Sequence, residues 1–201
     1  MFRLGISQRF DRIDGRDEAR DALDYRWSEF LWEQGILAIP LPTGIPDHEE
    51  YFAELKLDGF ILSGGNNIGT APQRDSLESA VLVFAGKKKL PVLGVCRGMQ
   101  FINHYLGGSL VEVTGHVATR HPLEGTMVAD RISNEVNSYH NLAITKPTLG
   151  QSLQVMASCD DGVVEAFKHS EFPWMGIMWH PERELPFSED DQKLIRDFFG
   201  V

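Results

Sequence analysis

One short segment, centred on Cys96, constrains the fold more than any other part of the chain. An apolar run at residues 90–93 precedes it and a helix-like segment at residues 99–106 follows, with Gly94 and Gly98 on either side. This pattern predicts a strand, a sharp turn and a helix, with the thiol at the apex of the turn. Such a turn is strained and needs small flanking residues. It places the thiol beside a helix N-terminus, which favours the thiolate form.

Composition narrows the classes of protein to consider. The 201 residues are 42% apolar and 24% charged, which predicts one globular domain spanning residues 1–201. The net charge of −10, from 19 Lys and Arg against 29 Asp and Glu, disfavours nucleic-acid binding. No stretch approaches the roughly 20 apolar residues of a membrane span. Only two cysteines, Cys96 and Cys159, are present; we expect both to be reduced and the compartment to be cytoplasmic.

The first half of the chain alternates apolar runs with helical stripes. Repeated strand–helix units predict an α/β fold with a mostly parallel central sheet and helices on both faces. Ligands of such folds gather at the carboxyl ends of the strands. The expected strands are residues 2–7, 36–41, 59–62 and 92–95, and the expected helices are residues 17–34, 47–57, 77–84 and 99–106.

The second half predicts a small antiparallel extension. Apolar segments at residues 153–158 and 163–167 flank Asp160, Asp161 and Gly162, which is a hairpin signal. A short strand is expected at residues 110–113 and another at 174–179. The closing helix, at residues 188–199, begins with an N-cap serine and three acidic residues.

A candidate base lies far downstream of the thiol. His180 and Glu182 are two positions apart, so in an extended segment their side chains share a face. Glu182 can then orient the imidazole while its other nitrogen meets Cys96, as in a Cys-His-Glu triad. By itself the segment would indicate only a surface corner at Pro181; beside a turn cysteine it indicates catalysis.

An acyl-transfer nucleophile also needs donors for the oxyanion. The N–H group of Arg97, next to the nucleophile, can supply one. The second is expected from Gly64 or Gly65, which follow the strand at residues 59–62 with bare backbone. In isolation these glycines would indicate only a tight turn.

Three ordered motifs carry a family resemblance. Residues 62–65, 94–100 and 180–182 together resemble the class I glutamine amidotransferase family, which implies a flavodoxin-like α/β domain. Further segments are similar to the gamma-glutamyl hydrolase branch, or peptidase C26. These are residues 101–103, 107–110, 115–116, 121, 137–140 and 179–183.

The resemblance implies a reaction. Cys96 attacks the gamma-carbonyl of a glutamine-like substrate, Gly65 and Arg97 stabilise the oxyanion, and a glutamyl thioester forms and is hydrolysed. Gln100 lies one helical turn beyond the nucleophile and can donate and accept hydrogen bonds, whereas His140 is also typical of a structural histidine. The implied substrate-binding residues are Gly64, Asn66, Gln100, Ser138, Tyr139 and His140.

The leaving group stays open at this point. Asn66 and Asn67 stand where gamma-glutamyl-gamma-aminobutyrate hydrolases usually carry aspartate and then proline, and the chain is shorter than theirs. A compact relative within the branch acts on gamma-glutamyl-CDP-amidate in capsule phosphoramidate pathways. A diphosphate would need local cations, and the candidates are Arg74, Lys87, Arg97, Arg120, Arg131 and Arg183.

We expect no cofactor and no metal. His116 and His121, with His104 nearby, match no familiar zinc spacing, and no cysteine pair accompanies them. Cys159 is expected to be a packing thiol.

Three functions compete. The first is a stand-alone hydrolase of a small gamma-glutamyl conjugate, for which a homodimer stays open. The second is a glutaminase subunit that delivers ammonia to a separate synthase. The third is a catalytically silent binding relative, against which the intact Cys96, His180 and Glu182 argue.

Overall fold

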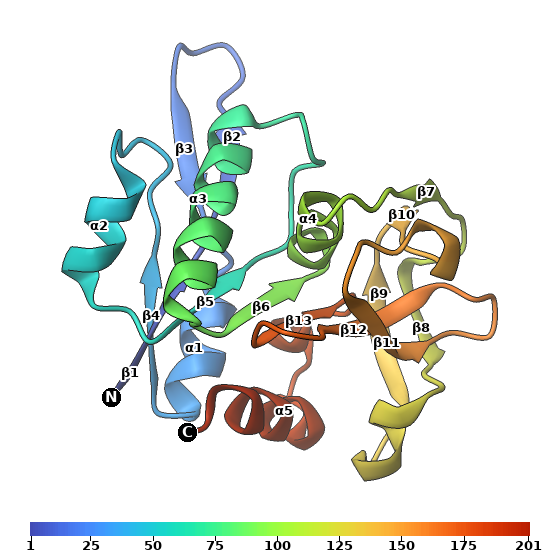
Figure 1. Cartoon of the computed structure of the whole chain (residues 1–201). Helices are drawn as coiled ribbons and strands as arrows, with labels where there is room; N and C mark the ends of the chain where they lie inside the picture. The colour runs from blue at the N-terminus through green and yellow to red at the C-terminus, as the bar shows by residue number, and fades with distance from the viewer.

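The computed structural model has a seven-stranded sheet with helices on both faces (Figure 1). It describes residues 1–201, the side chain of Asp130 excepted. The strand order is β11-β12-β13-β6-β5-β1-β4. The five strands from β13 to β4 are parallel; β12 pairs antiparallel with β13, and β11 pairs antiparallel with β12. The predicted fold class is confirmed.

The element bounds follow the apolar runs. The strands of the main sheet are β1 (Phe2–Ile6), β4 (Ile36–Pro40), β5 (Gly59–Leu62), β6 (Val92–Val95), β11 (Leu153–Ser158), β12 (Val164–His169) and β13 (Trp174–Ile177). The helices are α1 (Arg26–Glu33), α2 (His48–Leu55), α3 (Pro72–Lys88), α4 (Arg97–Tyr105) and α5 (Glu189–Phe199). Three two-stranded sheets pair β2 (Arg9–Arg12) with β3 (Ala19–Ala22), β7 (Val111–Glu112) with β10 (Leu142–Ala143), and β8 (Val117–Pro122) with β9 (Glu135–Tyr139). Short 3-10 turns cover Thr126–Asp130, Lys146–Thr148 and Pro181–Arg183.

Two hydrophobic clusters cover the two faces of the sheet. Helices α2, α3 and α4 pack on one face, with Phe52, Leu77 and Met99 in the core. Helices α1 and α5 pack on the other, where Trp27 and Ile195 are buried. Burying both faces explains why the central strands read as continuous apolar runs rather than as alternating patterns.

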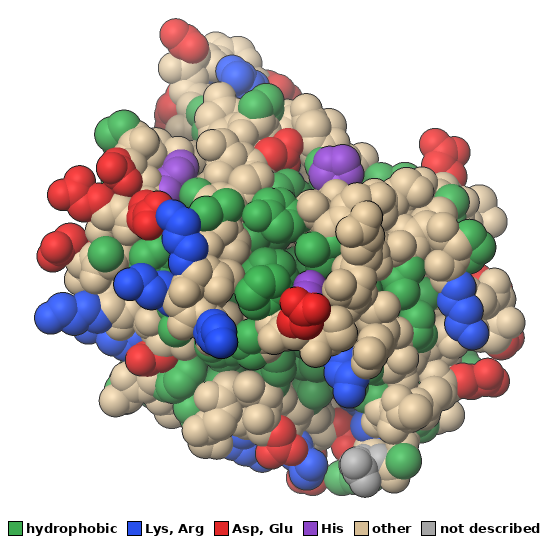
Figure 2. All heavy atoms as spheres, viewed as in Figure 1, with side chains coloured by type: hydrophobic (Ala, Val, Ile, Leu, Met, Phe, Trp, Pro, Cys, Tyr) green, Lys and Arg blue, Asp and Glu red, His purple; other side chains and the backbone are tan. Residues whose placement is uncertain are grey.

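The exterior is mixed in character. Figure 2 shows acidic and basic side chains interspersed over the face seen in Figure 1, with hydrophobic side chains gathered near its centre. No helix among the described residues combines the length and the apolar character needed to cross a membrane.

The predicted helix at residues 17–34 was wrong in its first half. Ala19–Ala22 form strand β3, which pairs with β2 in a hairpin, and only Arg26–Glu33 are helical. The Asp21 carboxylate accepts hydrogen bonds from the Thr43 N–H and hydroxyl at 2.9 and 2.8 Å, so it anchors the hairpin to a distant loop. Helical spacing of Ala19 and Leu23 was therefore accidental, because tertiary contacts override weak local periodicity.

Helix α4 begins almost in contact with its neighbouring strands. A Cβ atom at Gly98 would collide with the carbonyl oxygen of Leu62 in β5, and one at Gly94 would lie 2.6 Å from the Gly98 carbonyl carbon. Both positions therefore require glycine because neighbouring backbone, which cannot easily move, occupies the space.

This contact predicts a stability difference between two glycine variants. Gly98→Ala should lower the free energy of unfolding by about 1–3 kcal/mol, the usual cost of overpacking. Gly44→Ala is the matched control, since nothing lies within 4 Å of a Cβ atom there. Urea denaturation measures both; equal stability of the two variants would contradict the packing argument.

Candidate active site

The turn that holds Cys96 has the geometry that the sequence predicted. Strand β6 ends at Val95 and helix α4 begins at Arg97. Cys96 between them has a φ of 51° and a ψ of −105°, a conformation that non-glycine residues rarely adopt. Two backbone bonds hold it there: its N–H donates to the Ile177 carbonyl at 2.8 Å, and its carbonyl accepts from the Gln100 N–H at 3.0 Å.

His180 lies between the thiol and a carboxylate. Its Nδ1 is hydrogen-bonded to Glu182 Oε1 at 2.7 Å, and its side chain lines the same cavity as Cys96. Both His180 and Glu182 are 2% exposed. The structure therefore brings the three predicted triad residues together in the order thiol, imidazole, carboxylate.

The base is also fixed through its backbone. The Asn137 side chain accepts from the His180 N–H at 2.9 Å and donates to the His180 carbonyl at 2.8 Å. The same amide donates to Glu184 at 2.7 Å. Asn137 was part of a family motif in the sequence. Its hydrogen bonds to the His180 backbone form because strand β9 lies beside the segment that carries His180, which the sequence does not reveal.

Electrostatics favour a protonated imidazole at this position. Burial alone lowers the pKa of His180, but the Glu182 carboxylate and the nearby Cys96 outweigh burial and raise it to about 10. An imidazolium at neutral pH can donate a proton to a leaving group.

The loop after β5 approaches the same centre. A Cβ atom at Gly64 would lie 2.7 Å from Cε1 of His180, and Gly65 has a φ of +108°, in the region that favours glycine. Gly65 lines one cavity together with Cys96 and Arg97. The two residues predicted to supply the oxyanion donors thus line the cavity that contains the nucleophile.

A buried ionic cluster holds the loop that carries Gly64 and Gly65. The Arg74 guanidinium donates to the carbonyls of Ser63 at 2.6 Å and Gly64 at 3.0 Å, and to Glu78 at 2.9 Å. The Arg97 side chain contacts the Glu78 carboxylate as well. Arg74 and Glu78 are fully buried. Their helical spacing of four residues was the only sign of this pair in the sequence.

The cluster continues to strand β1. The Ser7 hydroxyl donates to Glu78 at 2.8 Å and accepts from the Ser63 N–H at 3.0 Å. The Ser63 hydroxyl donates to the Ser7 carbonyl at 2.6 Å. Buried charges with this many partners hold one loop conformation, because each lost bond would leave a desolvated polar group.

The cavity at the nucleophile is about 210 Å³ in volume and takes in part of the predicted binding set. Gly64 lines a smaller adjoining cavity. Asn66 instead bonds both backbone groups of Phe10, and the Ser138 hydroxyl donates to the His116 carbonyl at 2.8 Å. The lining residues are Gly65, Asn67, Cys96, Arg97, Gln100, Tyr139, His140, Asn141, Leu142, His180 and Arg183. Asn67, Asn141 and Leu142 are lining positions that had no binding signal in the sequence beyond their place next to motifs, whereas Arg183 was among the predicted cations.

The candidate cations lie in different places. Among them, Arg183 has its side chain at the cleft and in partial contact with solvent, with 4.7 Å between its guanidinium carbon and the centre of the Tyr139 ring. Its Nε also lies 3.7 Å from Glu182 Oε1. Arg9, which was not predicted, lines the adjoining cavity. The others are committed elsewhere: Arg74 and Arg97 to the buried cluster, Lys87 to Glu49, Arg120 to Glu184 and Arg131 to Asp191.

The buried cluster predicts a large loss of stability on neutralisation. Glu78→Gln leaves the buried Arg74 guanidinium without its carboxylate and leaves Arg97 with Asp75 alone, so the free energy of unfolding should fall by about 3–5 kcal/mol. Glu49→Gln is the control, because it breaks an exposed pair with Lys87, which contributes far less. Similar denaturation midpoints for the two variants would contradict the role assigned to the cluster.

Comparison with known proteins finds relatives that match almost the whole chain. The chain is 33% identical over 206 residues to the gamma-glutamyl-CDP-amidate hydrolase of Campylobacter jejuni, covering 98% of each chain. It is 25% identical to anthranilate synthase component 2 of Cyanophora paradoxa, covering 90% of this chain and 94% of that one.

Solved structures show the same fold. A glutamine amidotransferase from Thermotoga maritima superposes with a TM-score of 0.67 at 15% identity, covering 98% of this chain and 83% of that chain. The sequence profile described as Peptidase C26 matches residues 5–182. The turn cysteine, the base and the loop that faces them all lie within this span or at its end, and the chain belongs to the Peptidase C26 family.

Proposed function

We propose that this chain hydrolyses gamma-glutamyl amides through a thioester on Cys96. The observation that carries the proposal is the placement of His180, which lines the cavity that contains Cys96 and is hydrogen-bonded to Glu182. A base that is oriented in this way beside a strained turn thiol is the arrangement that nucleophilic acyl transfer requires.

The proposed reaction proceeds in two halves. The Cys96 sulfur attacks the gamma-carbonyl carbon, and the N–H groups of Gly65 and Arg97 stabilise the oxyanion. The carbon–nitrogen bond then breaks as His180 donates a proton to the leaving nitrogen, which leaves a glutamyl thioester. In the second half His180 takes a proton from water and the hydroxide attacks the thioester. The carbon–sulfur bond then breaks, which releases glutamate and restores the Cys96 thiolate beside protonated His180, with Glu182 orienting the imidazole throughout.

For the substrate we propose gamma-glutamyl-CDP-amidate. The near full-length similarity to the Campylobacter jejuni hydrolase of that name supports this choice. Arg9 and Arg183 both line the small cavity next to Gly65 and His180, where they could meet a diphosphate in the leaving group. Gamma-glutamyl-gamma-aminobutyrate is the competing conjugate.

The similarity to anthranilate synthase component 2 supports a second candidate function. In it the chain would be a glutaminase that delivers ammonia to a separate synthase. Such a subunit should turn over glutamine slowly when alone and should not prefer a larger conjugate.

Release of glutamate by the purified chain distinguishes these functions. We expect gamma-glutamyl-CDP-amidate to be cleaved faster than glutamine and gamma-glutamyl-gamma-aminobutyrate, and Cys96→Ala to abolish turnover while keeping the circular dichroism spectrum. Activity retained in Cys96→Ala would refute the mechanism. Slow cleavage of glutamine and of nothing else would favour the synthase-dependent candidate.

The raised pKa of His180 predicts the alkaline side of the pH profile. Because the group is protonated at neutral pH and loses its proton near pH 10, kcat/KM should stay high until well above the usual histidine range and then fall. Glu182→Gln removes the charge that raises the pKa, so the fall should begin at lower pH and kcat should drop. Superimposable alkaline limbs in the two enzymes would show that Glu182 does not tune His180.

Arg183 predicts the chemistry of the leaving group. Arg183→Gln should raise KM for gamma-glutamyl-CDP-amidate by about tenfold or more, as expected for loss of a charge-assisted hydrogen bond. The effect on gamma-glutamyl-gamma-aminobutyrate should be smaller. Lys87→Gln is a control of equal charge change at a surface pair with Glu49; an equal effect of both variants would contradict direct contact.

A further inference from the structure

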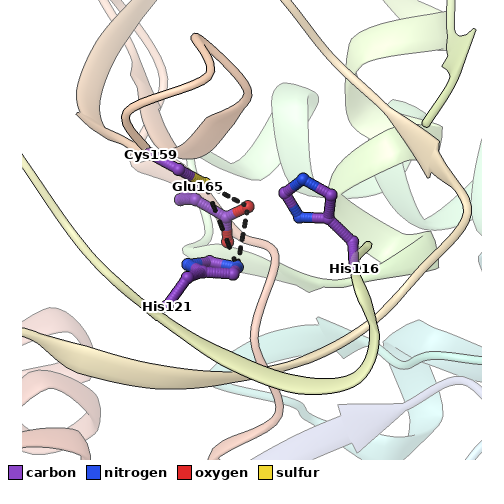
Figure 3. A group of neighbouring side chains, drawn as sticks. All are labelled: His116, His121, Cys159 and Glu165. Atoms are coloured by element: carbon purple, nitrogen blue, oxygen red, sulfur yellow. Dashed lines mark hydrogen bonds and ion pairs between the residues drawn. The ribbon is translucent and has the colours of Figure 1, made fainter. Parts of the chain in front are cut away.

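A second cluster of reactive side chains lies next to the residues that line the Cys96 cavity. His116 and His121 come from β8 and the turn before it, Cys159 from the β11–β12 turn, and Glu165 from β12 (Figure 3). One nitrogen, sulfur or oxygen atom from each lies within 4.8 Å of the others. His116, Cys159 and Glu165 are buried, and the His121 side chain is 11% exposed. Three chain segments thus bring together nitrogen, sulfur and oxygen atoms of the kinds that bind metal ions.

Several atoms of this cluster are buried without a hydrogen-bond partner. They are Nδ1 of His116, Nδ1 of His121, Oε2 of Glu165 and Nε2 of the adjacent His140. The ion-pair contacts of Glu165 in the described structure are histidines alone, at 3.6 Å to His121 and 3.5 Å to His140. A fully buried carboxylate with unpaired imidazole nitrogens around it is costly unless a cation lies among them.

His116 already has the second contact that metal-binding histidines show. Its Nε2 is hydrogen-bonded to Asp161 Oδ2 at 2.8 Å, which leaves Nδ1 free of hydrogen bonds inside the cluster. A carboxylate that accepts from one ring nitrogen fixes the tautomer and increases the basicity of the other nitrogen. Asp161 therefore prepares His116 to be a ligand.

Three of the four donors are spaced nearly as they would be around a tetrahedral ion. Cys159 Sγ lies 3.4 Å from Glu165 Oε1 and 3.9 Å from His121 Nε2, and the latter two atoms are 3.6 Å apart. Ordinary zinc–ligand bonds at a tetrahedral angle separate neighbouring donors by about 3.3–3.6 Å. A mixed set of thiolate, imidazole and carboxylate also favours zinc over calcium or magnesium, which prefer oxygen alone.

We propose that His116, His121, Cys159 and Glu165 bind one zinc ion, which joins β8 to the β11–β12 hairpin. In the structure the Cys159 thiol donates to Glu165 at 3.4 Å. A bound zinc ion would displace that proton and ligate the thiolate. The sequence-based expectation of a metal-free protein with a packing thiol at Cys159 rested on spacing along the chain, which cannot show that three segments meet.

A zinc ion bound at this site would stabilise the residues that line the Cys96 cavity. The His116 carbonyl accepts from the Ser138 hydroxyl at 2.8 Å and from the His140 N–H at 3.0 Å. The His116 and His140 rings lie 4.8 Å apart, and His140 lines the cavity at Cys96. An ion on His116 would therefore fix the strand that carries Tyr139 and His140 without touching the substrate.

Zinc content is the direct test, in a Cys96→Ala background that removes the other candidate thiol ligand. After loading with zinc sulfate and dialysis, we expect about one zinc ion per chain by elemental analysis, and almost none when Cys159→Ser is added. Cobalt loading should give a thiolate charge-transfer band that Cys159→Ser abolishes. Equal zinc content with and without Cys159 would overturn the proposal.

A milder pair of variants guards against misfolding. Asp161 has a side chain that is 48% exposed, so Asp161→Asn should fold, yet it should weaken zinc affinity about 10–100-fold in a competition titration with a chromogenic chelator. Asp160→Asn, the exposed neighbour, should leave affinity unchanged. Identical affinities in the two variants, or a melting temperature that neither zinc nor chelator shifts, would also contradict the site.

Discussion

The backbone turn at Cys96 is the constraint on which the rest of the site depends. Its positive φ is unfavourable for cysteine, and the N–H bond to Ile177 in β13 holds it. The same strand pairing aligns Ile177 with Val95 and then leads directly to His180. Sheet register therefore sets both the strain at the nucleophile and the position of its base, so the two cannot shift independently.

Buried charged groups fix the segments on either side of the Cys96 turn. Arg74, which pairs with Glu78, holds the carbonyls of Ser63 and Gly64 and thereby fixes the loop that lines the cavity at Gly65. On the far side, the Asp191 carboxylate of α5 accepts from the indole of Trp179, next to the base, and pairs with Arg131. Charged groups are expensive to bury, and here they fix the loop and strand that carry the chemistry rather than the core in general.

Sequence patterns predicted the features that depend on local chemistry. The buried strands, the Cys96 turn, the Ser188 N-cap of α5 and the β11–β12 hairpin all follow from residue type over a few positions. They could not predict features that join distant segments. The β2–β3 hairpin depends on Asp21 reaching a remote loop at Thr43, and nothing in local periodicity encodes that contact.

The candidate active site shows the same difference between features that are local in the sequence and features that join distant segments. Spacing predicted Cys96, His180 and Glu182 and the glycines that face them, because each motif is compact along the chain. It missed the clamp by Asn137 and the convergence of His116 with Glu165, since these arise only when β8, β9 and β12 come together. Asn66 was expected to contact substrate. In the structure its side-chain amide is hydrogen-bonded to the N–H and carbonyl groups of Phe10, a contact that the sequence did not predict.

The central claim is that Cys96 carries the glutamyl group during turnover. The most direct measurement is intact-protein and peptide mass spectrometry after rapid acid quenching of the enzyme with gamma-glutamyl-CDP-amidate. The account predicts a transient adduct with the mass of one glutamyl group, on the peptide that contains Cys96, decaying as glutamate is released. Turnover with no adduct at any quench time, or an adduct on another residue, would contradict it.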